Sequence, residues 1–259
     1  MPAAAPEHQT NEMPIDKKHP ETTVMAAVDY RILPGTKSEV ISLPEPVIPT
    51  TTDHLELQQY IDSLCVHTDT HSLTREKAME LIEVPEGLDV HEGVWCYEWM
   101  RRLCMDLNEL VIALLEDGCE PTKCHLMNAG EYQFLCASHP RPRECSAIDY
   151  IHHTLTQSIL LLLSPCFFDP SNPPSTHAFS SIARRLYRIF AHAWFEHHHV
   201  FWTVESETGV YKLFMAVSEK WRLVPVDLVI LPKEAGEWTV EGDGEEVDEF
   251  DRGETVSGR

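Results

Sequence analysis

Residues 89–118 decide the fold, and they read DVHEGVWCYEWMRRLCMDLNELVIALLEDG. Asp89 with Glu92 three positions later has the pattern of a helical capping box, and Gly118 is typical of a helix end. Between them, apolar side chains recur every three or four residues, as one buried face of an α-helix requires. These side chains are Trp99, Leu103, Leu107, Leu110, Val111 and Leu114. The stretch therefore predicts one long helix with a buried stripe.

The same reasoning predicts three further long helices around that one. They cover residues 146–164, opened by a capping signal at Ser146–Asp149, then about 182–193 and about 208–221. His54–Leu64 predicts a shorter helix, and Glu131–Ala137 is the one stretch that reads as a strand pair. We therefore predict a mainly α fold, a helical bundle with irregular, functional loops.

The two ends of the chain differ in composition from the middle. Residues 1–50 are polar and carry eight prolines, which predicts a disordered or extended N-terminal arm. Residues 232–259 are rich in Asp and Glu, which predicts a solvated acidic tail. The folded domain is therefore expected over residues 51–231.

Charge and cysteine content exclude several classes of function. The 259 residues carry a formal charge of −22, of which 233–259 contribute −7 from ten acidic and three basic residues. Such an excess disfavours broad binding to nucleic acid or to anionic membranes, both of which need cations. Apolar runs such as Ile159–Leu163 are far shorter than the roughly 20 residues of a membrane-spanning helix. Eight cysteines without a secretory signal predict a reducing compartment, where thiols stay free or bind metal.

Cysteine and histidine pairs mark a candidate metal site. Cys119 and Cys124 form a C-x4-C pair after the first long helix, and His192 and His197 form an H-x4-H pair near the end of the third. Positions five apart lie about 140° apart around a helix, so the second His must lie where the helix frays or must rotate its side chain back. Spacing leaves two alternatives open, namely free buried thiols and an all-thiolate site. The all-thiolate site would consist of Cys119, Cys124, Cys136 and Cys145.

A closed Cys2His2 site would be structural, because four protein ligands leave no coordination position for water or substrate. It would close a loop of nearly 70 residues. The chain has no H-E-x-x-H motif and no recognisable nucleophile motif. These absences disfavour the alternative of a zinc hydrolase, which would need three ligands and a general base.

A basic island interrupts the acidic chain. The 26 residues between Asp169 and Glu196 contain no Asp or Glu, although the overall frequency predicts about four. Within this window Arg184, Arg185 and Arg188 lie three and four positions apart, so their guanidinium groups can converge on one helix face. Such a trio suits a phosphate group. The alternative, a solvated face whose arginines pair with acids elsewhere, remains open at this point.

Taken together, several motifs resemble the Mob/phocein family. They are Gly93–Glu98 (GVWCYE), Cys119–Cys124, Phe134–His139 (FLCASH), Glu144–Tyr150 (ECSAIDY) and Arg184–His192 (RRLYRIFAH). The Pro-Gly-Thr-Lys turn at 34–37 and Leu57–Ile61 (LQQYI) resemble its phocein branch. The resemblance covers about residues 33–231. The proline cluster within Ser164–Thr176 and the two ends depart from the family pattern.

The resemblance implies a fold, a cofactor and a function. It implies a Mob-type helical bundle with a structural zinc ion on Cys119, Cys124, His192 and His197. It also implies a phosphopeptide pocket at Arg184, Arg185 and Arg188. The expected protein is a non-catalytic adaptor in a striatin-interacting phosphatase and kinase complex.

The implied partners are a striatin-like scaffold, protein phosphatase 2A subunits and germinal-centre-type kinases. The second expectation is a coactivator of NDR/LATS-class kinases. The expected location is the cytoplasm, with Golgi or nuclear-envelope membranes reached only through partners.

Overall fold

The computed structural model describes residues 45–164, 167 and 172–237. Most of the expected N-terminal arm and acidic tail lies outside these residues, as does the turn at 34–37. Part of Ser164–Thr176 does so as well. The predicted domain limits therefore stay predictions.

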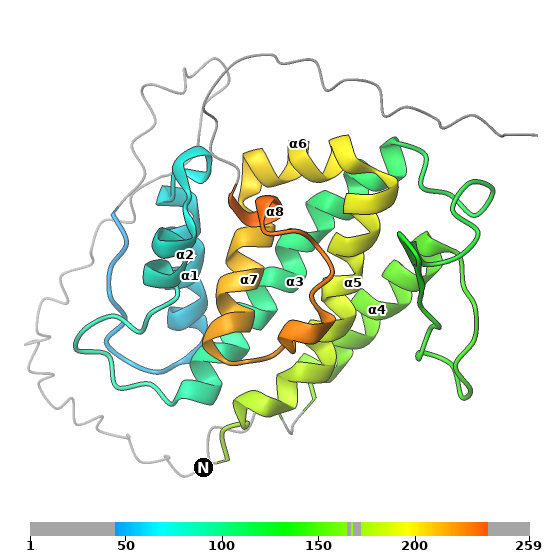
Figure 1. The fold of residues 1–259 in the computed structure, drawn as a ribbon. Coiled ribbons are helices and arrows are strands. Elements are labelled where there is room, and N and C mark those ends of the chain that lie inside the picture. The colour runs from blue at the N-terminus through cyan, green and yellow to red at the C-terminus, as the bar shows by residue number, and fades with distance from the viewer. Residues whose placement is uncertain (1–44, 165–166, 168–171, 238–259) are drawn as a thin grey trace, which may run out of the picture. The chain divides into compact units, whose positions relative to one another are not determined.

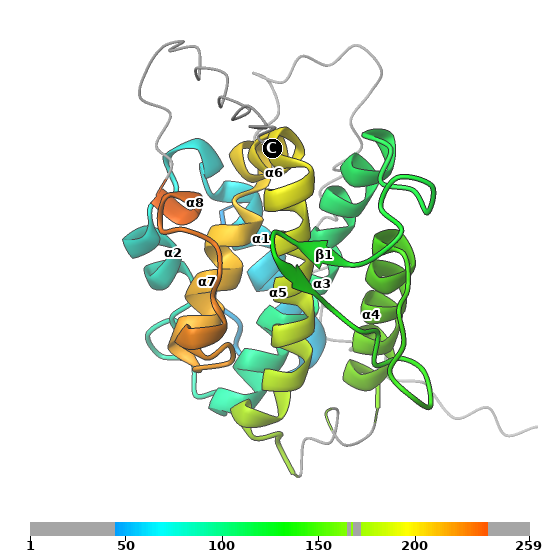
Figure 2. The same ribbon diagram turned by 45° about the vertical axis from the view of Figure 1, so that its right-hand side comes forward.

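Helix α3 (Glu92–Glu116) is the central element of the fold. It packs against α1 (His54–His67), α4 (Ala147–Leu162), α5 (Ser180–Glu196), α6 (His198–Thr208) and α7 (Val210–Lys220), as Figures 1 and 2 show. The predicted stripe is buried from Trp99 to Leu114, with Val111 at its margin. Burial of this stripe by five neighbouring helices is the main source of stability of the domain.

The start of α3 differs from the predicted capping box. The N-cap is His91, whose Nδ1 accepts the backbone N–H of Gly93 at 3.0 Å. Asp89 lies two residues before this N-cap. The imidazole of His91 therefore takes the role predicted for Asp89, because it accepts an amide of the first turn. Gly93 is required here, since a Cβ atom would lie 1.8 Å from the carbonyl oxygen of Pro174. The segment before α5 therefore packs directly on the start of α3.

The other long helices confirm the predicted mainly α class, although one starts later than predicted and two helices were not predicted. Ser146 caps α4 as predicted, its hydroxyl oxygen accepting the N–H of Asp149 at 3.2 Å. The last predicted helix starts later, at Val210, because Gly209 adopts a left-handed conformation with φ 61° and separates it from α6. The sequence reading missed α6 and α2 (Arg75–Leu81). Shorter pieces complete the described chain: the 3-10 helices η2 (Thr70–Ser72), η3 (Thr176–Phe179) and η4 (Val226–Leu228), and the helix α8 (Glu234–Glu237).

A long irregular connection joins α3 to α4. It contains a small hairpin of β1 (Asn128–Ala129) and β2 (Tyr132–Gln133), paired antiparallel. Gly130 makes its turn with φ 57°. The strand pair predicted at 131–137 is therefore shorter and begins earlier. Strand β1 packs against α5, which brings this connection beside the end of that helix (Figure 2).

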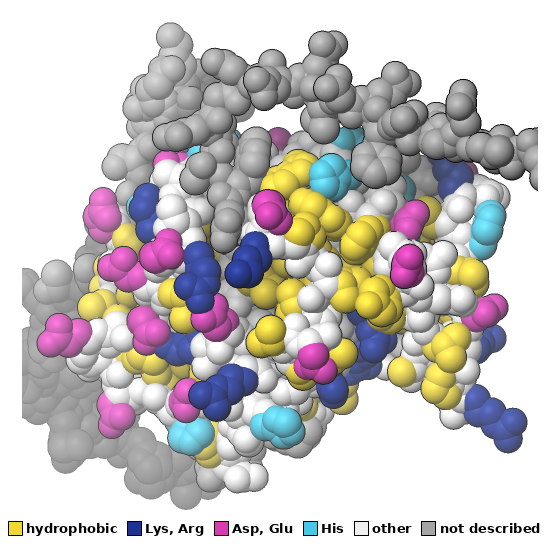
Figure 3. Space-filling view, in the orientation of Figure 1, with side chains coloured by type: hydrophobic (Ala, Val, Ile, Leu, Met, Phe, Trp, Pro, Cys, Tyr) yellow, Lys and Arg dark blue, Asp and Glu magenta, His cyan; other side chains and the backbone are white. Residues whose placement is uncertain are grey.

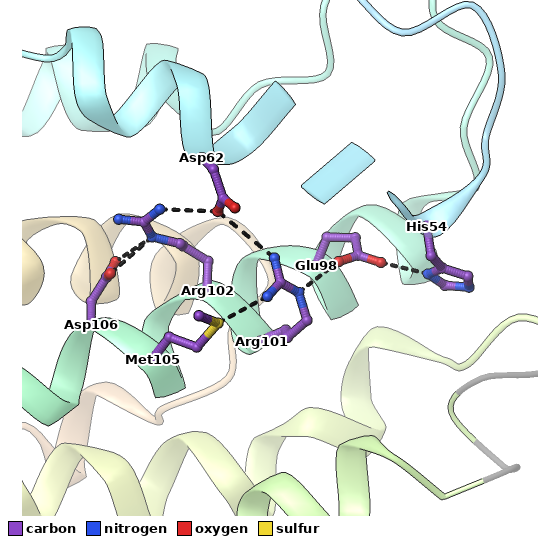
Figure 4. A network of polar contacts seen from close by, with 7 residues as sticks. All are labelled: His54, Asp62, Glu98, Arg101, Arg102, Met105 and Asp106. Atoms are coloured by element: carbon purple, nitrogen blue, oxygen red, sulfur yellow. Dashed lines mark hydrogen bonds and ion pairs between the residues drawn. The ribbon is translucent and has the colours of Figure 1, made fainter. Parts of the chain in front are cut away.

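A network of charged side chains attaches α1 to α3 (Figure 4). Glu98 of α3 is fully buried and accepts hydrogen bonds from His54 at 2.5 Å and from Arg101 at 3.0 Å. Arg102 reaches across to Asp62 of α1 at 3.0 Å. The buried carboxylate thus has two donors, which is the condition for burying a charge. No helix among the described residues has the length and apolar character needed to cross a membrane.

Candidate metal centre and arginine face

Two helix ends place the first group of metal-ligand side chains. Gly118, with φ 80°, turns the chain at the end of α3 and directs Cys119 into the core. Cys124 follows on the next turn, its N–H bonded to the carbonyl of Glu120. His192 lies four residues before the last residue of α5. His197 is the C-cap, with non-helical φ −138° and ψ 51°. The helix ends at the second histidine, which is one of the two ways in which the H-x4-H spacing can bring both rings together.

The four side chains converge on one point. All four ligand atoms of Cys119, Cys124, His192 and His197 lie within 4.8 Å of one another. The sulfur of Cys119 is 3.4 Å from Nε2 of His192, and the sulfur of Cys124 is 3.4 Å from Nε2 of His197. Tetrahedral zinc, with Zn–S of about 2.3 Å and Zn–N of about 2.0 Å, separates sulfur from nitrogen by about 3.5 Å. The group therefore has the dimensions of a zinc site.

Outer hydrogen bonds orient both imidazoles. Nδ1 of His192 donates to the backbone oxygen of Asn128 at 2.7 Å, and Nδ1 of His197 donates to Asp117 at 2.6 Å. Each bond leaves Nε2 free to face the thiols, the arrangement that metal-binding histidines commonly have. The hydrogen bond from His197 also lowers the pKa of Asp117. Sequence reasoning missed Asp117 and Asn128, because neither belongs to a ligand motif.

Burial controls the protonation of this site. It raises the pKa of the Cys119 thiol to about 12 and lowers that of His192 to about 4. His192 is therefore neutral at physiological pH, the form in which imidazole binds metal. The thiols need the charge of a cation to ionise, so metal binding would release protons. Four protein ligands leave no position for substrate, which makes a metal here structural.

The all-thiolate alternative does not form one cluster. Cys136 and Cys145 belong to a different group of side chains, with His139 and His153, and not to the group of Cys119 and Cys124. The described cysteines are all free of disulfide bonds.

The arginine face consists of Arg184, Arg185 and Arg188 on α5. Arg184 is exposed, and the other two are partly buried against the α3–α4 connection and α4. Arg188 donates to the hydroxyl of Tyr150 at 2.8 Å, and its guanidinium lies 4.7 Å from the ring centroid of Phe134. Figure 3 shows Lys and Arg side chains over the lower parts of α4 and α5. Arg185 and Arg188 both contact residues of α4, whereas Arg184 bonds back to the carbonyl of Ser180 on its own helix, and the use of the three as a binding site stays a prediction.

The charges of this face are not neutralised within the described part of the chain. None of the three guanidinium groups forms an ion pair with a described carboxylate. Burial lowers the pKa of Arg185, and the adjacent Arg188 and Arg184 lower it further. Three neighbouring cations that meet no described carboxylate repel one another, so an anion placed between them would be attracted to all three.

Comparison with known proteins identifies the class to which this helical domain belongs. A model of the Mob1/phocein family matches residues 70–230, which include the first metal group and the arginine face. MOB kinase activator-like 4 of Drosophila melanogaster is 37% identical over 219 residues, 82% of this chain and 93% of that protein. MOB-like protein phocein of Caenorhabditis elegans is 38% identical over 77% of this chain and 87% of that protein. The chain belongs to the Mob1/phocein family.

A more distant relative is the maintenance of ploidy protein mob1 of Schizosaccharomyces pombe. It is 28% identical over 61% of this chain and 74% of that protein. The match to the two animal proteins is thus both longer and higher in identity.

Proposed function

We propose that this protein is a non-catalytic adaptor that binds a phosphorylated peptide at its arginine face. The observation that carries the proposal is the set of Arg184, Arg185 and Arg188, which has no ion pair with a described carboxylate in a chain of charge −22. Three neighbouring cations that the described carboxylates leave unpaired gain most from a ligand of high negative charge. Phosphoserine and phosphothreonine supply about two negative charges and three acceptor oxygens.

The neighbours of the arginines prepare this surface for a phosphate. The ring of Phe134 and the hydroxyl of Tyr150 hold Arg188, and Gln157 accepts from Arg185 at 3.3 Å. Guanidinium groups held in place lose less conformational entropy when they bind. Tyr150 and Gln157 both lie on α4, so the packing of α4 against α5 sets the width of the site.

The proposed role of the first metal group is structural. Zinc on Cys119, Cys124, His192 and His197 would join the end of α3 to the end of α5. This is the helix that carries the arginine face, so the metal would support the binding surface without touching the ligand. The zinc ion supplies a fixed tetrahedral cross-link and no reaction step.

The proposed partners follow from the family. We propose that the protein acts in a striatin-interacting phosphatase and kinase complex, with a striatin-like scaffold, protein phosphatase 2A subunits and germinal-centre-type kinases. The identity of 38% to the C. elegans relative named phocein supports the phocein branch, from which we infer this complex. We place the complex in the cytoplasm, with Golgi or nuclear-envelope membranes reached through partners.

Coactivation of an NDR/LATS-class kinase is the second candidate, because several relatives are named MOB kinase activator-like. Affinity purification of the tagged protein from its native cells, followed by mass spectrometry, separates the two candidates. Recovery of striatin-like and phosphatase subunits supports the first, and recovery of an NDR-class kinase alone supports the second.

Calorimetry with phosphothreonine peptides tests the arginine face directly. The double variant Arg184→Ala/Arg188→Ala removes two of three cations, and each charge-assisted hydrogen bond contributes about 1.5–3 kcal/mol. We expect affinity to fall at least about tenfold, which corresponds to about 1.4 kcal/mol. The control is Arg222→Ala, an exposed arginine outside the face, together with the unphosphorylated peptide. Equal affinity of the double variant and the control would contradict the proposal.

A further inference from the structure

The arginine face keeps most of its hydrogen-bond donors free for a ligand. Its three guanidinium groups offer about fifteen N–H donors. Four of these donate within the described chain, two to backbone oxygens of α5 itself and two to side chains of α4. Among the described residues, no carboxylate forms an ion pair with any of the three groups. A ligand with several carboxylates would therefore meet donors that are already in place.

Several cations elsewhere in the described chain are already neutralised. Arg75, Arg102 and Lys220 each form an ion pair with a described carboxylate. The arginine face differs because α5 has no Asp or Glu before Glu196, its last residue. Salt screens the attraction between charges beyond about 8 Å at physiological ionic strength. A carboxylate that neutralises this face must therefore come close to it.

Carboxylates are concentrated in the part of the sequence that follows α8. Residues 238–259, which we name the acidic segment, lie outside the described residues and contain eight acidic and two basic residues, a formal charge of −6. Four of the acids stand within five consecutive positions, namely Glu245, Glu246, Asp248 and Glu249. We propose that the acidic segment binds the arginine face of its own chain and competes there with the phosphorylated ligand. This inference rests on the proposed function and adds a regulation of the same site.

The described chain leads the acidic segment towards α5. The backbone N–H groups of Ile230 and Leu231 donate to the hydroxyl of Tyr187 on α5, at 2.7 and 2.9 Å. Helix α8 then packs on α7 (Figure 1), and α7 packs on α5 through the rings of Phe214 and Tyr187. Two helix spacings amount to about 20 Å. An extended chain of eight to twelve residues spans about 26–40 Å. The four central acids can therefore reach the arginine face from Glu237, the last described residue.

Repulsion from the rest of the acidic chain opposes this contact. Residues 1–237 carry −16, the difference between −22 for the whole chain and −6 for the acidic segment. Most of these charges lie farther from the arginine face than the screening length of about 8 Å allows them to act, whereas a bound segment meets three guanidinium groups directly. The short-range attraction therefore decides where the segment binds.

Competition within one chain makes the arginine face selective. A segment joined to its site by a short linker has an effective concentration of about 1 mM. If the contact has a dissociation constant of about 0.5 mM, it leaves about a third of the molecules open. A phosphate group carries about two charges on three oxygens and displaces the carboxylates, each of which carries one. A peptide that is merely acidic has no such advantage over the acidic segment, so the face would favour phosphorylated ligands.

Arginine reactivity in the full chain tests the contact without any partner. Phenylglyoxal modifies guanidinium groups that no anion covers, and mass spectrometry of the digested protein measures the rate at each arginine. The segment variant replaces the four central acids by amides: Glu245→Gln/Glu246→Gln/Asp248→Asn/Glu249→Gln. The control variant makes the same four kinds of change at exposed positions of the described domain: Glu86→Gln/Asp89→Asn/Glu109→Gln/Glu116→Gln.

We expect Arg184 to react about threefold faster in the segment variant than in the wild type, because the third of molecules that is open becomes nearly all of them. The control variant should react like the wild type. Arg184 is exposed, so the helix itself does not hide it, and the exposed Arg222 outside the face is the internal reference. Circular dichroism checks that each variant is folded.

Calorimetry with a phosphothreonine peptide on the same three proteins separates this inference from the proposed function. We expect the peptide to bind the segment variant about threefold more tightly than the wild type or the control variant. If no protein binds the peptide but Arg184 reacts faster in the segment variant, the contact within the chain stands and the proposed function fails. Equal Arg184 rates in the wild type and the segment variant would overturn the contact, and peptide binding by both would leave the proposed function standing. A faster Arg184 reaction with unchanged peptide affinity would contradict the competition.

Discussion

Substitution of Cys119 by alanine tests the first metal group most directly. Structural zinc contributes an apparent free energy of about 10–16 kcal/mol in zinc-finger peptides, and Cys119 is one of four ligands. A quarter of that energy is about 3 kcal/mol, a large part of the 5–15 kcal/mol that stabilises a typical domain. For a domain of this size, about 3 kcal/mol lowers the melting temperature by about 6–12 °C. The loss is large because Cys119 is fully buried and no water can replace it as a ligand.

The assay is thermal unfolding followed by circular dichroism, with and without EDTA. Cys104→Ala is the matched control, because Cys104 is equally buried within α3 but belongs to neither metal group. We expect the control to lose about 1 kcal/mol, the typical cost of a point substitution, and to keep its sensitivity to EDTA. If Cys119→Ala melts within about 2 °C of Cys104→Ala, the structural role of this site is wrong.

Three further substitutions test the remaining energetics. Glu98→Ala should destabilise the domain by about 3 kcal/mol in urea unfolding, because it leaves the mostly buried Arg101 without its nearest carboxylate. Ser146→Ala should cost about 1 kcal/mol in the same assay, because it removes the cap of α4. Glu205→Gln should change the dependence of stability on pH. Burial raises the pKa of Glu205 from 4.5 to about 7, so the folded protein holds a proton that the unfolded chain releases. The wild type should therefore lose stability relative to Glu205→Gln as pH rises from about 4.5 to 7.

Each of these changes has a neighbour that should have little effect. Glu109→Ala on α3, Thr156→Ala on α4 and Glu207→Gln on α6 alter exposed side chains on the same helices. Surface substitutions of this kind usually stay within about 0.5 kcal/mol. A buried substitution that behaves like its exposed neighbour would contradict the corresponding assignment. For Glu205, a pH profile parallel to that of the wild type would do so.

The long helices were predictable because their evidence is local. An apolar stripe from Trp99 to Leu114 and a cap such as Ser146 need no knowledge of distant residues. Helix α6 was missed because it follows α5 after one non-helical residue, His197, without a Gly or Pro to mark the boundary. The cap of α3 was misplaced because His91, an uncommon N-cap, competes with the better-known pattern at Asp89.

The candidate metal ligands also divide into those that the sequence indicated and those that only the fold brings together. Sequence spacing marked Cys119, Cys124, His192 and His197 as candidates, and the family resemblance favoured them over the all-thiolate alternative. The sequence also contains Cys136 and His139 within one family motif, yet it shows no regular spacing that joins them to Cys145 and His153. That group depends on a backbone pairing between Cys136 and Arg143 and on where α4 begins.

By itself, then, the sequence determined the helical class and placed three arginines within two turns of one helix. It also determined two pairs of candidate metal ligands, Cys119 with Cys124 and His192 with His197. Only the tertiary structure decided which cysteine joins which histidine, and that the arginines meet no described carboxylate. The physical reason is distance along the chain. Periodicity records contacts within one helix, whereas Cys119 and His192 are 73 residues apart and meet only because α3 and α5 end side by side.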